Sequence, residues 1–286
     1  MSKLLFTGIA VAIIGSTSAM AADLPTKAPV YKAAPMTDPG FFGSLTGGYL
    51  FQSNREYFIS PNLGGEAGGF GPGWTGRGTV GYRWANNWDV AVGIEGANFK
   101  EGTSVLSYTG NTAVHAPKGN YYAVDGEVGY TFRSGTNFRL FAGPRYVRWA
   151  MSDADGQAVP FTFDQHNSGW GPRGGFEWSG PLGWNNTGWF LDGSVSYIFG
   201  KLTASAGGAG AGAPDVSLTK NYAQWDLKGG LDWQVAPKSK LAVGYQVDSW
   251  NGALAAIEYN GFGLVQASGS AKTFTHGPFL RFSYNY

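Results

Sequence analysis

The sequence predicts an all-β fold, a single up-and-down antiparallel transmembrane β-barrel of about ten strands. Three observations carry this prediction: segments of alternating polarity, connections that alternate between long and short, and two groups of aromatic residues on the apolar faces of the segments. Glycine supplies 46 of the 286 residues, aromatic residues make up 16% of the chain, and cysteine is absent. A soluble sandwich and a glycine-rich fibre would share this composition, so the three observations must decide between them.

Residues 1–21 have the features of a secretory signal peptide. Lys3 supplies the positive start, an apolar stretch follows, and Ala19 and Ala21 provide a small-residue cleavage site. After this stretch, no apolar run approaches the roughly 18 residues that a membrane helix needs. We therefore expect an exported chain that has no membrane-spanning helix.

The rest of the chain divides into a tail and one domain. Residues 22–40 are rich in proline and small residues, which predicts a flexible periplasmic tail, and residues 41–286 are expected to form the barrel. Acidic and basic residues are equal in number after the predicted cleavage site. This balance argues against a nucleic-acid partner, because nucleic-acid binding requires a basic surface.

Segments of about ten residues with alternating polarity are typical of membrane barrel strands. In 222–235, for example, Trp225, Leu227 and Trp233 alternate with polar residues, as the two faces of a strand require. The sequence contains ten such segments: 41–52, 74–84, 88–99, 121–133, 137–151, 168–178, 188–200, 222–235, 240–250 and 273–286.

The connections between these segments sort by length. Those after the odd-numbered segments span about 16 to 22 residues, whereas those after the even-numbered segments are short. A meander with one long-loop rim and one short-turn rim gives this pattern, and a Greek-key sandwich does not. Twelve strands would result if the apolar connection 252–271 folded back into the wall. That connection could instead form a plug or a short surface helix.

Aromatic residues form two groups on the apolar faces, which is the pattern of the girdles at the two membrane interfaces. One group lies next to the short turns: Trp84, Trp88, Phe132, Phe138, Trp178, Trp189 and Trp233. The other lies near the long connections: Tyr49, Trp74, Tyr122, Tyr146, Trp170, Tyr197, Trp225, Tyr245 and Phe274.

The polar faces are expected to line the lumen. Basic and acidic residues are nearly balanced on these faces, so no strong ion selectivity is predicted. The candidate pore-lining residues are Arg77, Arg83, Asp89, Glu95, Asp125, Glu127, Arg139, Arg145, Arg173, Glu177, Asp226, Lys228, Asp232 and Arg281.

Some of these charges are predicted to form pairs across neighbouring strands. A turn at 85–87 would place Arg83 opposite Asp89 and Arg77 opposite Glu95, and opposite charges at such positions are favourable. Asp125 and Glu127 are expected to come within reach of Arg145. The pairs could be structural bridges that fill the barrel, or they could line a narrow water-filled path, and both hold if the network leaves a gap.

Three Gly-Pro pairs occur inside predicted strands, with prolines at 144, 172 and 278. Proline cannot donate to the strand ladder, so each pair is expected to mark a β-bulge. One consequence would be a bend in the wall. Another would be a constriction, if the bulges aim Arg145 and Arg173 across the lumen.

No catalytic, metal or cofactor site is predicted. Asp164 and His166, together with Asp153 and Asp155, are of the residue types that omptin outer-membrane proteases use, but here they fall in one predicted loop. Sharing a water molecule would require them to lie on opposing walls. The three histidines of the chain are too scattered for a metal site.

Several stretches resemble known outer-membrane proteins. The stretch "ADLPTKAPVYKA" is similar to the start of small alphaproteobacterial barrels. Four others resemble the Legionella-type pore-forming outer-membrane proteins: "FAGPRYVRW", "WFLDGSVSYIFGK", "LAVGYQVDSWNG" and "THGPFLRFSYNY". The resemblance implies an outer-membrane pore, and it brings no catalytic motif.

We therefore expect a passive pore for ions and small hydrophilic solutes. The alternative is a plugged, non-conducting barrel that acts through its surface loops. Expected partners are outer-membrane lipid and lipopolysaccharide, and a second copy of the chain is a further possible partner, in a homo-oligomer. Phe282, Tyr284 and Tyr286 resemble the C-terminal signal that the outer-membrane assembly machinery recognises.

Overall fold

A computed structural model describes residues 39–53, 56–60, 64–108, 111–115, 117–153, 161–183, 186–208, 216–253, 256–259, 264–268 and 272–285. The predicted signal peptide, nearly all of the predicted tail and Tyr286 lie outside these residues. The part of the chain that the structure describes contains no helix long and apolar enough to cross a membrane.

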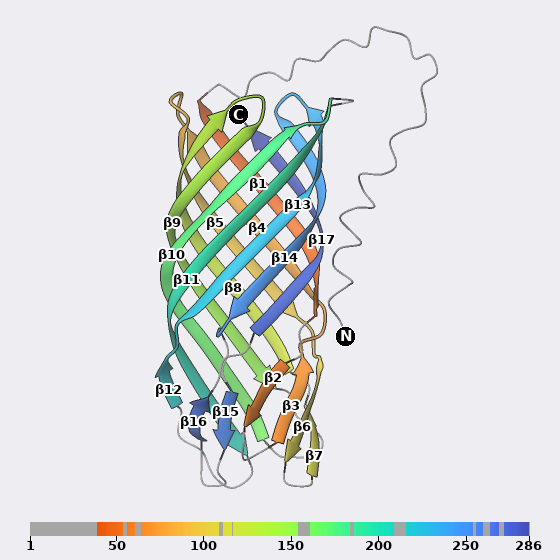
Figure 1. Ribbon diagram of the computed structural model, residues 1–286, viewed down its shortest axis with the longest axis vertical. Coiled ribbons are helices and arrows are strands. Elements are labelled where there is room, and N and C mark those ends of the chain that lie inside the picture. Colours follow the sequence, from red (N-terminus) through yellow and green to blue (C-terminus); the bar gives the residue numbers. More distant parts are fainter. Residues whose placement is uncertain are drawn as a thin grey trace, which may run out of the picture. The chain divides into compact units, whose positions relative to one another are not determined.

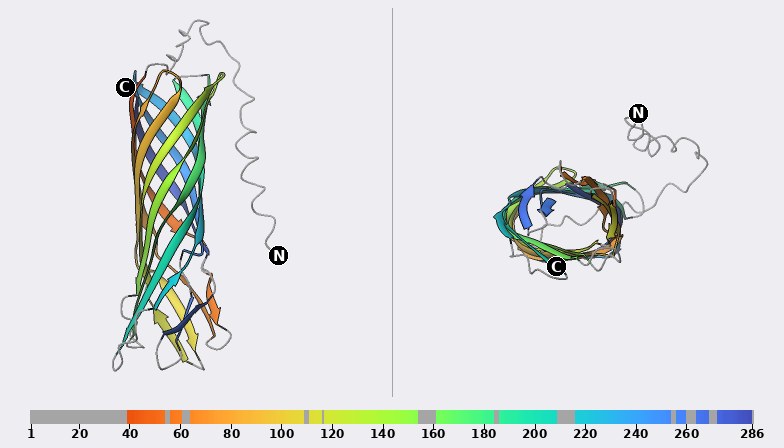
Figure 2. Two further views of the ribbon diagram at one scale, coloured as in Figure 1. Left: turned by 90° about the vertical axis from the view of Figure 1, so that its left-hand side faces the viewer. Right: turned by 90° about the horizontal axis from the view of Figure 1, so that it is seen from below.

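Ten antiparallel strands form a closed barrel (Figures 1 and 2). Each coincides with one of the ten predicted segments, so the predicted fold class is confirmed. Closure comes from β1 pairing with β17 and from β10 pairing with β11. The strands are β1 (Gly40–Gln52), β4 (Gly73–Arg83), β5 (Trp88–Phe99), β8 (Pro117–Arg133), β9 (Asn137–Asp153), β10 (Phe161–Pro181), β11 (Thr187–Gly208), β13 (Tyr222–Ala236), β14 (Ser239–Asn251) and β17 (Lys272–Asn285).

Short strands lie at the long-loop rim, at the lower end of Figure 1. One sheet contains β2 (Glu56–Ser60), β3 (Gly64–Gly69), β6 (Thr103–Tyr108) and β7 (Asn111–His115). The short strand β12 (Val216–Thr219) pairs with the end of β11, and β15 (Ala256–Tyr259) pairs with β16 (Leu264–Ser268). Neither β15 nor β16 enters the wall, because β14 and β17 pair directly with each other. The twelve-strand alternative is therefore wrong, and residues 256–259 and 264–268 of this connection form strands rather than the suggested short helix.

The outer surface of the barrel is apolar. Leu45, Trp74 and Val195 are 67%, 65% and 63% exposed on this face. Within each of the two predicted aromatic groups, rings on neighbouring strands contact each other. The ring centres of Trp178 and Trp189 lie 5.0 Å apart near the short turns, and those of Tyr146 and Trp170 lie 5.0 Å apart near the long loops. A continuous apolar surface between two aromatic belts is suited to a lipid bilayer, where only closed barrels and helices satisfy their backbone groups.

Strands β10 and β11 are longer than predicted, at 21 and 22 residues. Asp164 pairs with Ser152 on one side and with Ser205 on the other, and it therefore lies inside β10. The assignment of Asp164 and His166 to a loop is wrong. These extensions carry too little polarity alternation to be detected in the sequence, and their pairing partners stabilise them as strands.

The Gly-Pro pairs do not form bulges. Pro144 faces Pro172, and the pairing register is the same before and after each pair. A Cβ atom at Gly143 would overlap the carbonyl oxygen of Gly126, and one at Gly171 would overlap that of Tyr197. Because glycine has no side chain, the neighbouring strands can approach closely at the position where proline forms no backbone hydrogen bond. The strands therefore stay in register without the extra residue of a bulge. The predicted bulges are wrong.

Candidate functional site: the barrel lumen

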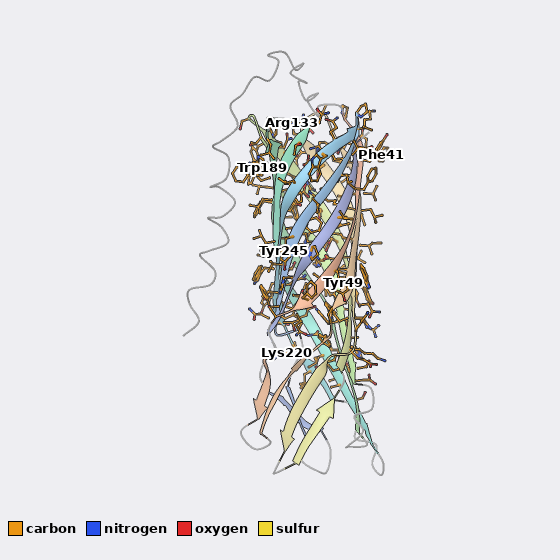
Figure 3. All side chains as sticks on the ribbon, turned by 90° about the vertical axis from the view of Figure 1, so that its right-hand side faces the viewer. Phe41, Tyr49, Arg133, Trp189, Lys220 and Tyr245 are labelled. Carbon is orange, nitrogen blue, oxygen red and sulfur yellow. The ribbon has the colours of Figure 1, made fainter. Side chains whose placement is uncertain are left out.

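The inward-facing side chains form three layers along the lumen. A cavity lies near the short turns, a network of ion pairs fills the middle, and an aromatic cluster lies toward the long loops. In Figure 3, Arg133 is near the short-turn end together with Phe41 and Trp189, and Tyr49 and Tyr245 lie farther along the barrel. All of the predicted pore-lining residues lie on the lumen side of their strands.

Asp125 on β8 is at the centre of the ion-pair network. Its carboxylate lies 2.8 Å from Arg77 and 3.4 Å from Arg145, and the side chains of Asp125 and Arg145 are completely buried. Arg145 also lies 3.1 Å from Glu95 and donates a hydrogen bond to the hydroxyl of Tyr121. A charge with so little access to water depends on such partners, since the loss of one leaves the other charge buried and unpaired.

Glu127 binds three arginines from three different strands. Arg77 on β4 lies 3.1 Å away, Arg139 on β9 lies 3.2 Å away, and Arg173 on β10 forms a short ion pair with the same carboxylate. Asp89 is shared in a similar way, at 3.2 Å from Arg83 and 2.6 Å from Arg139. The network therefore ties together strands that are not neighbours in the wall.

Most of the predicted cross-strand pairs are confirmed. Arg83 is opposite Asp89 and Arg77 is opposite Glu95, with 3.0 Å between the charged atoms of the latter pair. Arg145 contacts Asp125 as expected. The expectation that Arg145 would also reach Glu127 is not met by any ion pair between described residues. Glu127 is bound instead by Arg77, Arg139 and Arg173.

The remaining predicted residues have partners around the wall. Lys228 lies 3.7 Å from Glu95, and Arg139 lies 2.8 Å from Glu177. Asp226 accepts a hydrogen bond from Ser194. The other pairs are Asp232 with Lys240 and Arg281 with Asp192.

Aromatic rings support several of the guanidinium groups. Arg139 and Arg173 lie over the ring of Phe141, at 5.0 Å and 4.7 Å from its centre, and Arg281 lies 4.0 Å from the centre of Phe190. Cation–π contacts of this kind hold the planar groups in fixed orientations against the wall.

The cavity near the short turns has a volume of about 220 Å3. Glu177 and Lys240 line it with side chains that are 47% and 35% exposed, so solvent reaches this part of the lumen. Among the described residues, eight basic and five acidic side chains line it: Arg77, Arg83, Arg133, Arg139, Arg173, Lys228, Lys240 and Arg281 against Glu127, Glu177, Asp192, Asp226 and Asp232.

The long-loop half of the lumen is filled by aromatic side chains. We define the aromatic cluster as Phe70, Phe99, Tyr121, Trp149 and Trp250, each at most 5% exposed. Phe70 and Phe99 stack on Trp149 at 5.9 Å and 5.8 Å between ring centres, and Trp250 meets Trp149 edge-on at 5.2 Å.

This cluster is the main feature that the sequence analysis missed. Tyr121, Trp149 and Trp250 share the strand parity of the inward charges Asp125, Arg145 and Asp248, so the alternation itself contained the signal. The predicted arginine constriction is wrong for Arg145, which is completely buried in ion pairs. Arg173 does line the cavity.

The histidine and aspartate of the protease-like stretch do not face the lumen. Gln165 and Asn167 on β10 are buried at 2% and 0% exposure, whereas Asp164 is exposed, so Asp164 and His166 lie on the opposite, outer face of the strand. Asp155 lies outside the described residues. Within the described ranges, no group of three or more His, Cys, Asp or Glu residues is arranged to hold a metal ion.

Comparison with known proteins places the fold. The outer-membrane protease OmpT from Escherichia coli superimposes with a TM-score of 0.51 over 87% of this chain and 97% of OmpT, at 11% identity. The fold is that of an outer-membrane β-barrel. The chain is also similar to OprG from Pseudomonas aeruginosa, with a TM-score of 0.42 and 11% identity over 88% of this chain and 99% of OprG. It is similar to the transport unit of the Escherichia coli autotransporter AIDA-I as well, with a TM-score of 0.44 and 12% identity over 97% of each chain. No protein-family model matches the chain, and no curated protein matches its sequence.

Proposed function

We propose that this barrel is a narrow outer-membrane pore for the passive diffusion of ions and small hydrophilic solutes. The observation that carries this proposal is the solvent-accessible cavity inside the lumen, which is lined by charged side chains over the short-turn half of the barrel. A barrel interior that serves only as a structural core would gain more from apolar packing than from buried charges.

The proposal includes the cellular context that the sequence predicts. The chain would be exported by its signal peptide and inserted into the outer membrane by the assembly machinery, with lipid and lipopolysaccharide around its apolar wall. It would be a relative of the Legionella-type pore-forming proteins. It would have no catalytic activity, which is supported by the outward position of Asp164 and His166.

In this pore, the aromatic cluster would be the narrowest point. Several buried polar atoms near the rings have no hydrogen-bond partner among the described residues, including the indole nitrogens of Trp149 and Trp250 and the hydroxyl of Tyr222. An unpartnered buried donor costs about 1–3 kcal/mol, so these groups favour water molecules between the rings. A file of such waters would connect the cavity to the long-loop side.

Planar-bilayer recording of the refolded protein tests the proposal. We expect small, discrete conductance steps from the wild type, and larger steps from a Trp149→Ala/Trp250→Ala variant because the narrowest point is removed. A variant with Trp170→Ala, which removes a ring from the outer surface, is the control and should conduct as the wild type does. The absence of steps from the wild type in all salts would overturn the pore.

The second candidate is a non-conducting barrel that acts through its surface loops. The aromatic cluster favours it, because five closely packed rings at one end of the lumen are what a closed barrel would contain. This candidate predicts conductance steps only after both tryptophans of the cluster are removed.

A further inference from the structure

We propose that the short-turn end of the lumen contains a binding site for a small soluble oxyanion, such as phosphate or a carboxylate. The site is formed by Arg83, Thr131, Arg133 and Asn137, all of which line the cavity. Its role in selecting anions for passage depends on the proposed pore, whereas the binding itself does not.

Arg133 is the first reason for this assignment. It lies at the end of β8, opposite Asn137 on β9, and the charged side chain that acts on it is another arginine, Arg83. Among the described residues, no carboxylate lies within ion-pair distance of Arg133, and its Nε atom is buried without a hydrogen-bond partner. The other arginines that line the cavity each have a carboxylate partner. A guanidinium beside a like charge has a vacant donor fork of the kind that binds oxyanions.

Thr131 gives a second and independent reason. It lies two residues before Arg133 on the same face of β8, it is 3% exposed, and its hydroxyl has no hydrogen-bond partner among the described residues. A buried hydroxyl without a partner is costly. A ligand oxygen in the cavity would satisfy both this hydroxyl and the Arg133 Nε atom.

The balance of charge around the cavity agrees with an anion. Eight basic side chains and five acidic ones line it among the described residues, and adding the buried Asp89 gives eight against six. The surface of the cavity is therefore more basic than the lumen as a whole, in which Glu95 and Asp125 also pair with the lining residues Arg77, Arg173 and Lys228. Arg133 and Thr131 are on the lumen side of β8, whereas lipid contacts its outer side, so the ligand is a soluble anion rather than a lipid headgroup.

The test uses the full barrel, refolded in detergent, and isothermal titration with inorganic phosphate and separately with acetate at constant ionic strength. We expect saturable binding by the wild type. Binding should weaken about tenfold in Arg133→Gln and in Thr131→Val, because each loses one hydrogen bond to a charged ligand. Arg148→Gln removes the same charge from an exposed position on the outer face and should bind as the wild type does.

A wild type that binds neither anion, or Arg133→Gln and Thr131→Val variants that bind like the wild type, would overturn the site. Thr131→Val retains all charges and nearly the same shape, so it tests the site even if Arg133→Gln fails to fold. Conductance measured in a planar bilayer then separates the two proposals. Binding without conductance would preserve the site and reject the pore, and conductance without binding would do the opposite.

Discussion

Asp125 and Arg145 face each other across β8 and β9, with 3.4 Å between Oδ1 and Nη1, and neither side chain is accessible to solvent. They lie where the charged middle layer meets the aromatic cluster, because Arg145 also contacts Tyr121. The pair thus links the polar and aromatic parts of the lumen.

We expect Arg145→Met to reduce the free energy of unfolding by about 3–5 kcal/mol, because it leaves Asp125 and Glu95 short of a buried partner. Urea unfolding of the barrel in lipid vesicles measures this. Arg83→Met is the matched control, since the Arg83 side chain is 17% exposed, whereas that of Arg145 is completely buried. A similar loss in both variants would contradict the special role of the central pair.

Tyr121→Phe should destabilise the barrel by about 1–3 kcal/mol. The hydroxyl of Tyr121 accepts hydrogen bonds from Arg145 and Gln224. Without it, the buried Gln224 amide loses this acceptor and the Nη2 atom of Arg145 keeps only Glu95. Tyr122→Phe changes the adjacent residue, which lies on the outer face, and should cost less than about 1 kcal/mol. The same unfolding assay compares the two, and an equal effect would mean that the inward hydroxyl contributes nothing specific.

Gly143→Ala should prevent folding or destabilise the barrel severely, because the new Cβ would overlap the backbone of β8. Gly47→Ala provides the contrast, since a Cβ at that position meets no atom within 4 Å. There, alanine should leave stability unchanged or raise it by about 0.4–1 kcal/mol by restricting the unfolded chain. Refolding yield, followed by the shift in gel mobility on heating, distinguishes them. Efficient refolding of Gly143→Ala would show that the strand contact is not required.

Deletion of Tyr286 should impair assembly in cells, because Phe282, Tyr284 and Tyr286 together resemble the signal that the assembly machinery recognises. The strand before it has the position that this prediction needs, since Asn285 pairs with Phe42 at the closure of the barrel. The amount of heat-modifiable protein in the outer-membrane fraction measures assembly. Tyr286→Phe should assemble normally, and normal insertion of the deleted form would reject the prediction.

The alternation of polar and apolar residues along each segment was sufficient to predict much of this structure. The parity of 121–133 separated the outward Tyr122 from the inward Asp125, and the short turn at 85–87 gave the register of Arg83 with Asp89. These features depend on neighbours in sequence or across one turn, where geometry leaves few choices.

Contacts across the lumen could not be predicted in this way. Arg139 reaches Asp89, and Arg77 reaches Glu127, over separations of 50 residues in the chain. Which side chains meet there depends on the tilt and stagger of strands in the closed barrel. The same reason explains why the aromatic cluster was missed, although Trp149 and Trp250 had inward parity.

The sequence by itself determined where ten wall strands lie, which face of each strand points outward, and which charged side chains point into the lumen, because side chains alternate between the two faces of a strand. The twelve-strand alternative was excluded only by the structure, in which β14 and β17 pair directly. Only the tertiary structure decided how those charges are distributed. Closure of the barrel gathers five rings at the long-loop end, surrounds Glu127 with three arginines, and leaves Arg133 beside Arg83 without a carboxylate partner among the described residues. These arrangements depend on which strands face each other across the lumen, and that is a property of the closed barrel rather than of any one strand.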